Sequence, residues 1–276
     1  MTCERIYLDK NDDTVTLDCC VAELSREMDL TKRPAMLVLP GGGYHMRSDR
    51  EAEPIARQYY AAGFNTFVLR YSINDLARFP RPLAQASLAI KYIRDNAEKL
   101  NIDPKRVFAV GFSAGGHLAA CLASMWKDEE LARFCGSMPY GINRPDGVIL
   151  SYAVTAFSAS REDEFLFDEV TVGIGGKCVT DEEKLRWSPA DHVDSDSAPA
   201  FFWHTSDDPV VPVKNALYMA AKYAENGIKF ESHIYPHGPH GMALCNHETE
   251  SGNPEYLNPR IAQWIKLSVE WIETLL

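Results

Sequence analysis

The stretch that decides the fold reads Val107-Phe-Ala-Val-Gly-Phe-Ser-Ala-Gly-Gly-His-Leu-Ala-Ala120. Its first four residues predict a buried strand, and residues 118–126 predict a helix. Between them stands Gly-x-Ser-x-Gly, the pattern of a nucleophile elbow, in which a serine occupies a sharp strand-to-helix turn with its hydroxyl exposed. Gly111 and Gly115 fit such a turn, because strand and helix approach too closely there for a Cβ atom. Ser113 is therefore the candidate nucleophile.

Strand and helix patterns alternate on both sides of this motif. An N-terminal hairpin is expected over 5–8 and 14–22, and further strands over 35–40, 65–71, 146–154, 199–204 and 230–235. Helices are expected over 53–62, 82–100, 213–226 and 259–275. The alternation predicts an α/β fold: a mostly parallel, doubly wound sheet with helices on both faces. Because ligands of such sheets bind at the carboxyl ends of the strands, we expect the catalytic and binding residues to lie there.

One segment interrupts the alternation. Residues 156–190 are charged, rich in Phe and Gly, and without a clean period, and they fall between two core strands. We interpret them as a small lid-like insertion, because a loop-rich segment of this length is more often functional than idle. With 276 residues, the chain fits one large α/β domain spanning residues 1–276.

Composition narrows the choice of partners. The formal net charge of −11 argues against nucleic acid or an anionic membrane, since both select a basic face. No apolar run reaches the roughly 18 residues of a transmembrane helix, and the N-terminus lacks the pattern of a signal peptide. The seven cysteines are scattered, at positions 3, 19, 20, 121, 135, 178 and 245. They indicate reduced thiols in a cytoplasmic protein and no metal site.

A serine nucleophile needs a base to accept its proton and an acid to orient that base. His240 lies five residues past the strand that ends at Tyr235, in Pro236-His-Gly-Pro-His-Gly-Met242. The glycines allow a tight loop that can bring an imidazole to the elbow. His237 shares the loop and is the rival, and a solvated surface histidine is the other alternative. We prefer His240 as the base, because Gly241 relieves crowding beside the serine.

The acid is expected after the preceding strand, where Asp207 and Asp208 are adjacent. Pro209 keeps the chain at Asp208 extended, which favours a rigid and aimed carboxylate. We therefore predict Asp208 as the acid. Asp207 is the alternative, and its simpler role is a hydrogen bond within the loop.

Three consecutive glycines, Gly41 to Gly43, follow the buried strand at 35–40. They let the backbone fold so that it presents N–H groups to a reacting carbonyl. We expect an N–H of Gly42 or Gly43, together with that of Ala114, to stabilise the oxyanion. A merely flexible loop is the alternative. A phosphate-binding loop is excluded, because no Lys-Ser/Thr follows.

Taken together, these motifs resemble those of the α/β-hydrolases, and among them the small bacterial esterases that include acetyl-xylan, feruloyl and hormone-sensitive-lipase-like enzymes. The resemblance rests on four stretches: 39–44, 103–119, 204–212 and 238–241. The chain order Ser113, Asp208, His240 is also that of this superfamily. The resemblance implies these three residues as nucleophile, acid and base. Pro40 stands where the lipase-like branch has His, which favours the carbohydrate-esterase-like branch.

The resemblance implies hydrolysis of carboxylic esters of small acyl groups, with acetylated sugars among the candidates, through an acyl-enzyme on Ser113. Such chemistry requires no metal and no organic cofactor, and its partner is a small-molecule ester. Tyr44, Phe157 and Trp187 are the expected substrate-binding residues. For the two aromatic residues of the insertion, the alternative is that they hold the lid down.

Two other functions stay open. A small serine peptidase of the prolyl-oligopeptidase type uses the same order of catalytic residues, although such enzymes usually carry a large extra domain. A non-catalytic binding module with a hydrolase fold is the alternative from another class. The intact serine, acid and base argue against the second, and covalent labelling of Ser113 separates it from an enzyme.

Overall fold

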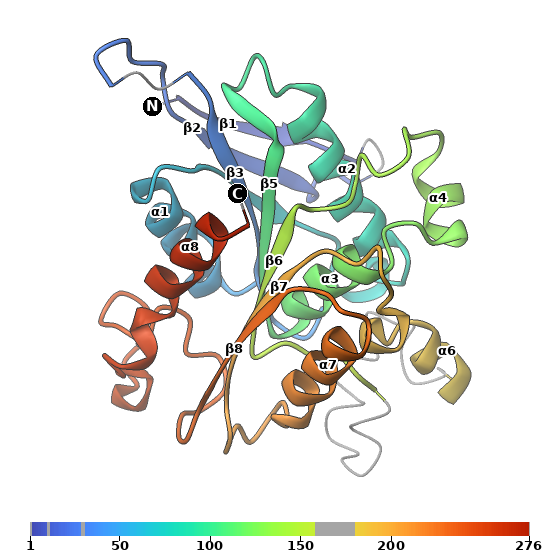
Figure 1. Cartoon of the computed structure of the whole chain (residues 1–276), viewed down its shortest axis with the longest axis vertical. Helices are drawn as coiled ribbons and strands as arrows, with labels where there is room; N and C mark the ends of the chain where they lie inside the picture. Colours follow the sequence, from blue (N-terminus) through green and yellow to red (C-terminus); the bar gives the residue numbers. More distant parts are fainter. Residues whose placement is uncertain (1, 10–11, 29–30, 158–179, 276) are drawn as a thin grey trace.

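A computed structural model describes residues 2–9, 12–28, 31–157 and 180–275 (Figure 1). Its centre is an eight-stranded sheet with the order β1-β2-β4-β3-β5-β6-β7-β8. The strands are β1 (Thr2–Tyr7), β2 (Thr16–Val21), β3 (Arg33–Leu39), β4 (Asn65–Arg70), β5 (Ile102–Phe112), β6 (Gly147–Ser151), β7 (Ala200–Thr205) and β8 (Phe230–Tyr235).

The sheet is mostly parallel, as the alternation of elements predicts. β1 pairs with β2 and β2 with β4 in antiparallel fashion, whereas all pairings from β4 through β3 to β8 are parallel. The N-terminal hairpin expected from the sequence is the β1–β2 pair. Since parallel strands end at the same edge, the loops after β3, β5, β7 and β8 meet there.

Helices cover both faces of the sheet (Figure 1). They are α1 (Glu53–Ala61), α2 (Arg81–Asp95), α3 (Ser113–Ser124), α4 (Glu129–Cys135), α6 (Asp181–Arg186), α7 (Lys214–Glu225) and α8 (Trp264–Glu273). One core cluster joins the sheet to α2, α3 and α7, and the other joins it to α1 and α8. The predicted α/β fold with helices on both faces is confirmed.

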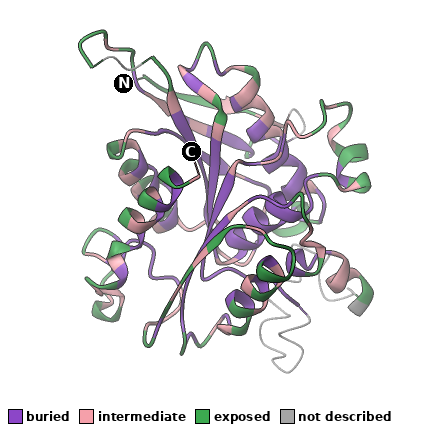
Figure 2. Ribbon diagram, viewed as in Figure 1, coloured by how far each residue is buried: buried purple, intermediate pink, exposed green. Residues whose placement is uncertain are grey.

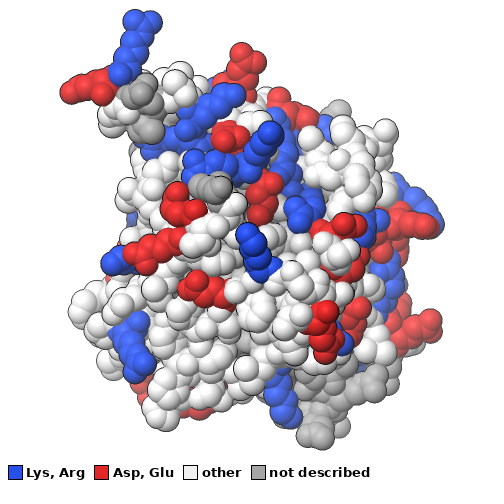
Figure 3. Space-filling model, viewed as in Figure 1, with Lys and Arg blue, Asp and Glu red and all other residues white. Residues whose placement is uncertain are grey.

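The central strands are buried along most of their length (Figure 2). Because both faces are covered, these strands carry continuous apolar sequence rather than alternating sequence. The two edges differ from the centre: β1 is exposed at almost every position, and β8 alternates. Side chains of both charge signs lie interspersed on the face drawn in Figure 3. The absence of a nucleic-acid partner stays a prediction.

Element boundaries differ from the sequence prediction in two informative places. The helix expected over 82–100 ends at Asp95, where the Asn96 side chain donates a hydrogen bond to the Tyr92 carbonyl, one turn back. The helix expected from residue 118 begins at Ser113. Glycine is a poor helix former, so periodicity misses the first turn, and close packing imposes the conformation instead: a Cβ at Gly116 would lie 2.5 Å from that of Ala153.

The predicted insertion over 156–190 lies largely outside the described residues, which resume at Thr180. Its described part contains α6 and a short 3-10 helix, η4 (Pro189–His192). Across the ranges that the structure describes, no helix combines the length and the apolar character needed to cross a membrane.

Candidate active site

Ser113 occupies a left-handed turn between β5 and α3, with φ of 50°. A β-carbon at Gly111 would lie 2.2 Å from the carbonyl oxygen of Gly115, and one at Gly115 would lie 2.1 Å from that of Leu39. Neither position can carry a side chain, because no Cβ contact is this short. The elbow expected from the Gly-x-Ser-x-Gly pattern is therefore present, and its two glycines have the steric role that the sequence predicts.

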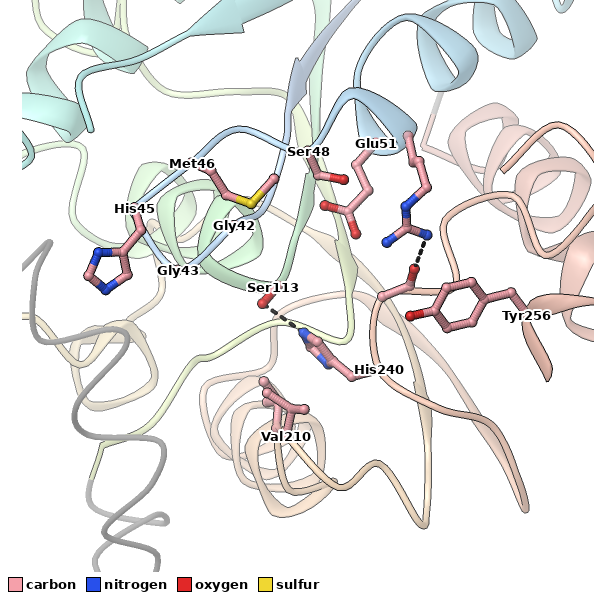
Figure 4. A pocket seen from close by; sticks show the side chains of 13 residues that line it. Gly42, Gly43, His45, Met46, Ser48, Glu51, Ser113, Val210, His240 and Tyr256 are labelled. Atoms are coloured by element: carbon pink, nitrogen blue, oxygen red, sulfur yellow. Dashed lines mark hydrogen bonds between the residues drawn. The ribbon is translucent and has the colours of Figure 1, made fainter. Parts of the chain in front are cut away.

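Three side chains from separate loops form one hydrogen-bonded chain (Figure 4 shows its serine and histidine). His240 Nε2 lies 2.8 Å from Ser113 Oγ, and His240 Nδ1 lies 2.8 Å from Asp208 Oδ2. A carboxylate can only accept, so Nδ1 carries the imidazole proton and Nε2 accepts from the serine hydroxyl. This is the arrangement in which a histidine can take the proton of a serine.

The Asp208 carboxylate is buried, with only 9% of the residue exposed. Its Oδ1 accepts the backbone N–H groups of Val210 at 2.8 Å and Val211 at 2.9 Å. Burial alone would raise the pKa of this carboxyl, but hydrogen bonds from His204 and His240 outweigh it and hold the pKa well below its usual value. Asp208 is therefore ionised at neutral pH and held in one orientation.

The two rival residues pair with each other at the surface. His237 Nδ1 lies 2.9 Å from Asp207 Oδ2, and their side chains are 84% and 53% exposed. Asp207 also accepts the N–H of Gly238 at 2.9 Å. The structure thus brings Ser113, Asp208 and His240 together and keeps both rivals out of that hydrogen-bonded chain.

The glycine loop after β3 lies beside the serine. Gly42 and Gly43 have φ of 124° and 61°, values open to few residues other than glycine. The N–H of Gly41 is already donated to Glu51 Oε2, at 2.9 Å. Ala114 stands in the first turn of α3, where a backbone N–H has no partner within its own helix. The assignment of Gly42, Gly43 and Ala114 as oxyanion donors stays a prediction.

Two residues that the sequence analysis missed support this loop and the histidine. Glu51, in the 3-10 helix η1 (Asp49–Glu51), is 3% exposed. Its Oε1 accepts the hydroxyl of Tyr152 at 2.7 Å, which in turn accepts the N–H of Ala243 at 3.0 Å. The Tyr152 ring meets the His240 ring edge to face, with centroids 5.0 Å apart. Because Glu51 lies in a charged run typical of a solvated surface, no signal in one sequence marks it.

A cavity of about 450 Å³ opens at the serine (Figure 4). It is lined by Gly42, Gly43, His45, Met46, Ser48, Arg50, Glu51, Ser113, Val210, Val211, His240, Gly241 and Tyr256. Arg50 holds one wall: its guanidinium donates to the carbonyl of Gly241 at 2.7 Å and lies 4.9 Å from the centre of the Tyr256 ring. The cavity therefore places Ser113 near the guanidinium of Arg50 and the apolar side chains of Met46, Val210 and Val211.

The expected substrate-binding residues do not line this cavity. Tyr44, Phe157 and Trp187 are each less than 5% exposed and pack around His117. The Trp187 carbonyl accepts from His117 Nε2 at 2.8 Å, so Nδ1 is free to accept the Tyr44 hydroxyl, also at 2.8 Å. Burial lowers the pKa of His117 to about 4. Within the described part of the chain, these three aromatic side chains are therefore buried in the core. Their contact with a substrate stays a prediction.

Within the described ranges, no group of three or more His, Cys, Asp or Glu side chains is arranged to hold a metal ion.

Comparison with known proteins identifies the family. The BD-FAE family model matches residues 25–223, a range that contains Ser113 and Asp208 and ends before His240. Endo-1,4-beta-xylanase B of Butyrivibrio fibrisolvens is 38% identical over 232 residues, which make up 81% of this chain and 35% of that protein. The chain spans about a third to a half of the length of the curated relatives it matches first.

Two solved structures are similar over almost the entire chain. MGS-M1, an α/β hydrolase from a Medee basin deep-sea metagenome library, is 35% identical, with a TM-score of 0.81 over 100% of this chain and 98% of that one. An acetyl ester-xyloside bifunctional hydrolase from Caldicellulosiruptor lactoaceticus is 30% identical, with a TM-score of 0.79 over 99% of this chain and 96% of that one. This protein belongs to the BD-FAE family, within the α/β-hydrolase superfamily.

Proposed function

We propose that this protein is a serine esterase that hydrolyses carboxylic esters of small acyl groups, with acetylated sugars as the favoured class. The observation that carries the proposal is the pair of 2.8 Å hydrogen bonds from Ser113 to His240 and from His240 to Asp208. Membership of the BD-FAE family and the similarity to an acetyl ester-xyloside hydrolase support it. The cavity of about 450 Å³ beside the serine supports a small acyl group.

In the acylation step, Ser113 Oγ attacks the ester carbonyl carbon while His240 Nε2 takes the hydroxyl proton. Asp208 stabilises the imidazolium that forms. The negative oxygen of the tetrahedral intermediate is held by the N–H of Ala114 and by one from the glycine loop. A donor of this kind is typically worth about 2.7–4 kcal/mol in the transition state. When the intermediate collapses, the C–O bond breaks and His240 gives its proton to the leaving alcohol.

In the deacylation step, a water molecule takes the place of the alcohol. His240 removes a proton from the water as its oxygen attacks the acyl carbon, and the second tetrahedral intermediate releases the carboxylic acid. The proton returns from the imidazole to Ser113 Oγ. The enzyme is then unchanged, and one ester and one water have become one acid and one alcohol.

A fluorophosphonate probe tests the nucleophile, since it phosphonylates only an activated serine. We expect a single adduct on the intact chain, mapped to Ser113, and none on Ser113→Ala. Ser48→Ala is the matched control, because Ser48 also lines the cavity and its loss should leave labelling intact. Failure of the folded wild-type chain to label would favour a non-catalytic module.

Rates on acetyl, butyryl and octanoyl nitrophenyl esters and on acetylated xylo-oligosaccharides test the substrate class. We expect kcat/KM to fall as the acyl chain lengthens and acetylated sugars to be deacetylated. Preference for the octanoyl ester would overturn the small-acyl proposal. Cleavage of a prolyl peptide with no turnover of any ester would favour a peptidase.

A further inference from the structure

Two cysteines lie opposite each other at the edge of the sheet farthest from β8. Cys3 of β1 and Cys20 of β2 are direct partners in the antiparallel register. Their Sγ atoms are 2.9 Å apart, across 17 positions of sequence. Neither residue contributes to the cavity at Ser113, so the proposed hydrolysis leaves this pair unexplained.

The backbone spacing of this pair suits a covalent bond. Residues directly opposite in an antiparallel pair have Cα atoms about 4.5–5.5 Å apart, and disulfides bridge Cα separations of about 4.4–6.8 Å. To bond, the two sulfur atoms need to close from 2.9 Å to about 2.05 Å. No rearrangement of the strands is required.

Small molecules can reach the pair. Cys3 is exposed and Cys20 is half-buried. Both line a cavity of about 880 Å³ whose other walls include Tyr60 of α1 and Arg70 of β4. Cys19, next along β2, is 4% exposed and belongs to the core under the sheet, because successive side chains of a strand point to opposite faces. A dissolved oxidant can therefore reach Cys20 but not the adjacent, buried Cys19.

We propose that Cys3 and Cys20 form a reversible intrachain disulfide by exchange with a low-molecular-weight disulfide such as oxidised glutathione. In the first step, the Cys3 thiolate attacks one sulfur of the oxidant, forms a mixed disulfide and expels one glutathione thiolate. In the second, the Cys20 sulfur attacks the Cys3 sulfur and expels the other glutathione. Two protein thiols are oxidised, one glutathione disulfide is reduced to two thiols, and the two protons go to solvent or to the leaving thiolates.

The surroundings of the two sulfurs set the order of attack. Burial raises the pKa of Cys20 to about 12, and the neighbouring Cys3 contributes in the same direction. Since the thiolate is the nucleophile, Cys20 is the weaker first attacker. Once Cys3 carries glutathione, the adjacent Cys20 has a disulfide within reach, and proximity compensates for its small thiolate fraction.

The bond would join β1 to the rest of the sheet. β1 pairs only with β2 among the described strands, and its exposed positions bury little apolar surface. The bridge lowers the conformational entropy of the unfolded chain, because it closes a loop there, and this favours the folded state. Because β4 and β3 lie between β2 and β5, the geometry at Ser113 should not change. Oxidation is therefore expected to raise Tm and to leave kcat/KM within about twofold.

The test treats the full chain with oxidised glutathione and compares intact masses before and after reduction. We expect the wild type to lose two hydrogens and its Tm to rise by about 5 °C. Trypsin should release residues 1–5 linked to residues 11–26, which hold Cys19 and Cys20. Cys20→Ser should stop at a single glutathione on Cys3, whereas Cys3→Ser should give neither the bridge nor a bound glutathione.

Cys135→Ser is the matched control, since Cys135 is also half-buried but lies on α4. It should form the bridge as the wild type does. A folded wild-type chain whose Cys3 remains open to alkylation after oxidation would overturn the proposal. So would a persistent mixed disulfide on the wild type, or a bridge that survives in Cys20→Ser. None of these readouts depends on esterase activity, so this inference and the proposed function can fail separately.

Discussion

The carboxylate of Glu51 offers the sharpest test of how the site is held in place. It is 3% exposed and accepts the N–H of Gly41 at 2.9 Å and the hydroxyl of Tyr152 at 2.7 Å. The first bond fixes the start of the glycine loop, and the second fixes a ring that packs against His240. We predict that Glu51→Gln lowers both stability and turnover.

The size of the effect follows from the two bonds. A glutamine keeps one carbonyl oxygen, so one bond survives as a neutral bond, worth about 0.5–1.5 kcal/mol in place of about 1.5–3 kcal/mol for a charged acceptor. Its NH₂ group faces the second donor and leaves it unpaired, which costs about 1–3 kcal/mol in a buried place. The free energy of unfolding should therefore fall by about 2–4 kcal/mol. A displaced oxyanion donor costs at most about 10²–10³-fold in kcat, so we expect a loss of about 10–100-fold.

The assay combines steady-state kinetics on nitrophenyl acetate with urea unfolding of the same preparations. We expect kcat to fall with little change in KM, since the glycine loop is proposed to hold the oxyanion of the transition state. Glu53→Gln is the matched control: it removes the same charge two residues away, from a side chain that is 75% exposed, and should behave as wild type. Reduced stability with unchanged kcat would make Glu51 a structural residue only. Wild-type values for both quantities would refute the reasoning altogether.

Three further predictions concern single positions. Asp208→Asn should lower kcat by about 10³–10⁴-fold through loss of the ionised partner of the imidazole, while Asp207→Asn stays within about twofold; equal losses in steady-state kinetics would contradict the choice of acid. The pKa of His117 is about 4 in the folded chain and about 6.5 in the unfolded chain. Between pH 6.5 and pH 4 this histidine is therefore protonated mainly in the unfolded state, and folding stability falls as the pH is lowered through that window. Urea unfolding should show a loss of about 2 kcal/mol at pH 5 relative to pH 7 from this group, and His117→Gln should lack that part of the pH dependence even if its overall stability is lower. Gly115→Ala should lower the free energy of unfolding by about 3 kcal/mol or more, because the added Cβ has no space. The control Gly227→Ala, whose Cβ would have nothing within 4 Å, should cost only about 1–2 kcal/mol for its left-handed φ. Similar losses for both variants in denaturant titrations would contradict the steric argument.

The residues that could be identified from the sequence share one property: each belongs to a short motif that can be recognised without knowing the rest of the fold. The elbow, the triple glycine and the Asp-Pro pair each need a particular residue type at a fixed spacing, whatever the rest of the fold does. The apolar runs reveal the strands in the same way, since a strand buried on both faces needs an unbroken apolar run. Because the carboxyl ends of parallel strands lie at one edge of a sheet, Ser113, Asp208 and His240, which follow such strands, are expected at that edge.

What escaped prediction depends on contacts that no local pattern records. Glu51 has the sequence context of a surface carboxylate, and it becomes a buried acceptor only because Gly41 and Tyr152, which are distant from it in sequence, donate to it in the folded chain. Tyr44 directly follows two of the glycines, and its sequence position does not reveal that its ring is buried against His117. A sequence shows that an aromatic ring is near a site but not on which side of the backbone it packs.

The spacing of the proposed catalytic groups along the chain has a consequence for biosynthesis. Ser113 precedes His240 by 127 positions, and the imidazole follows β8, which closes the far edge of the sheet. At a translation rate of about 5–20 residues per second, the ribosome makes the hydroxyl about 6–25 s before the group that accepts its proton. During that interval the nascent chain carries Ser113 without the histidine proposed to activate it, and we expect reactivity to arise only when β8 has joined the sheet.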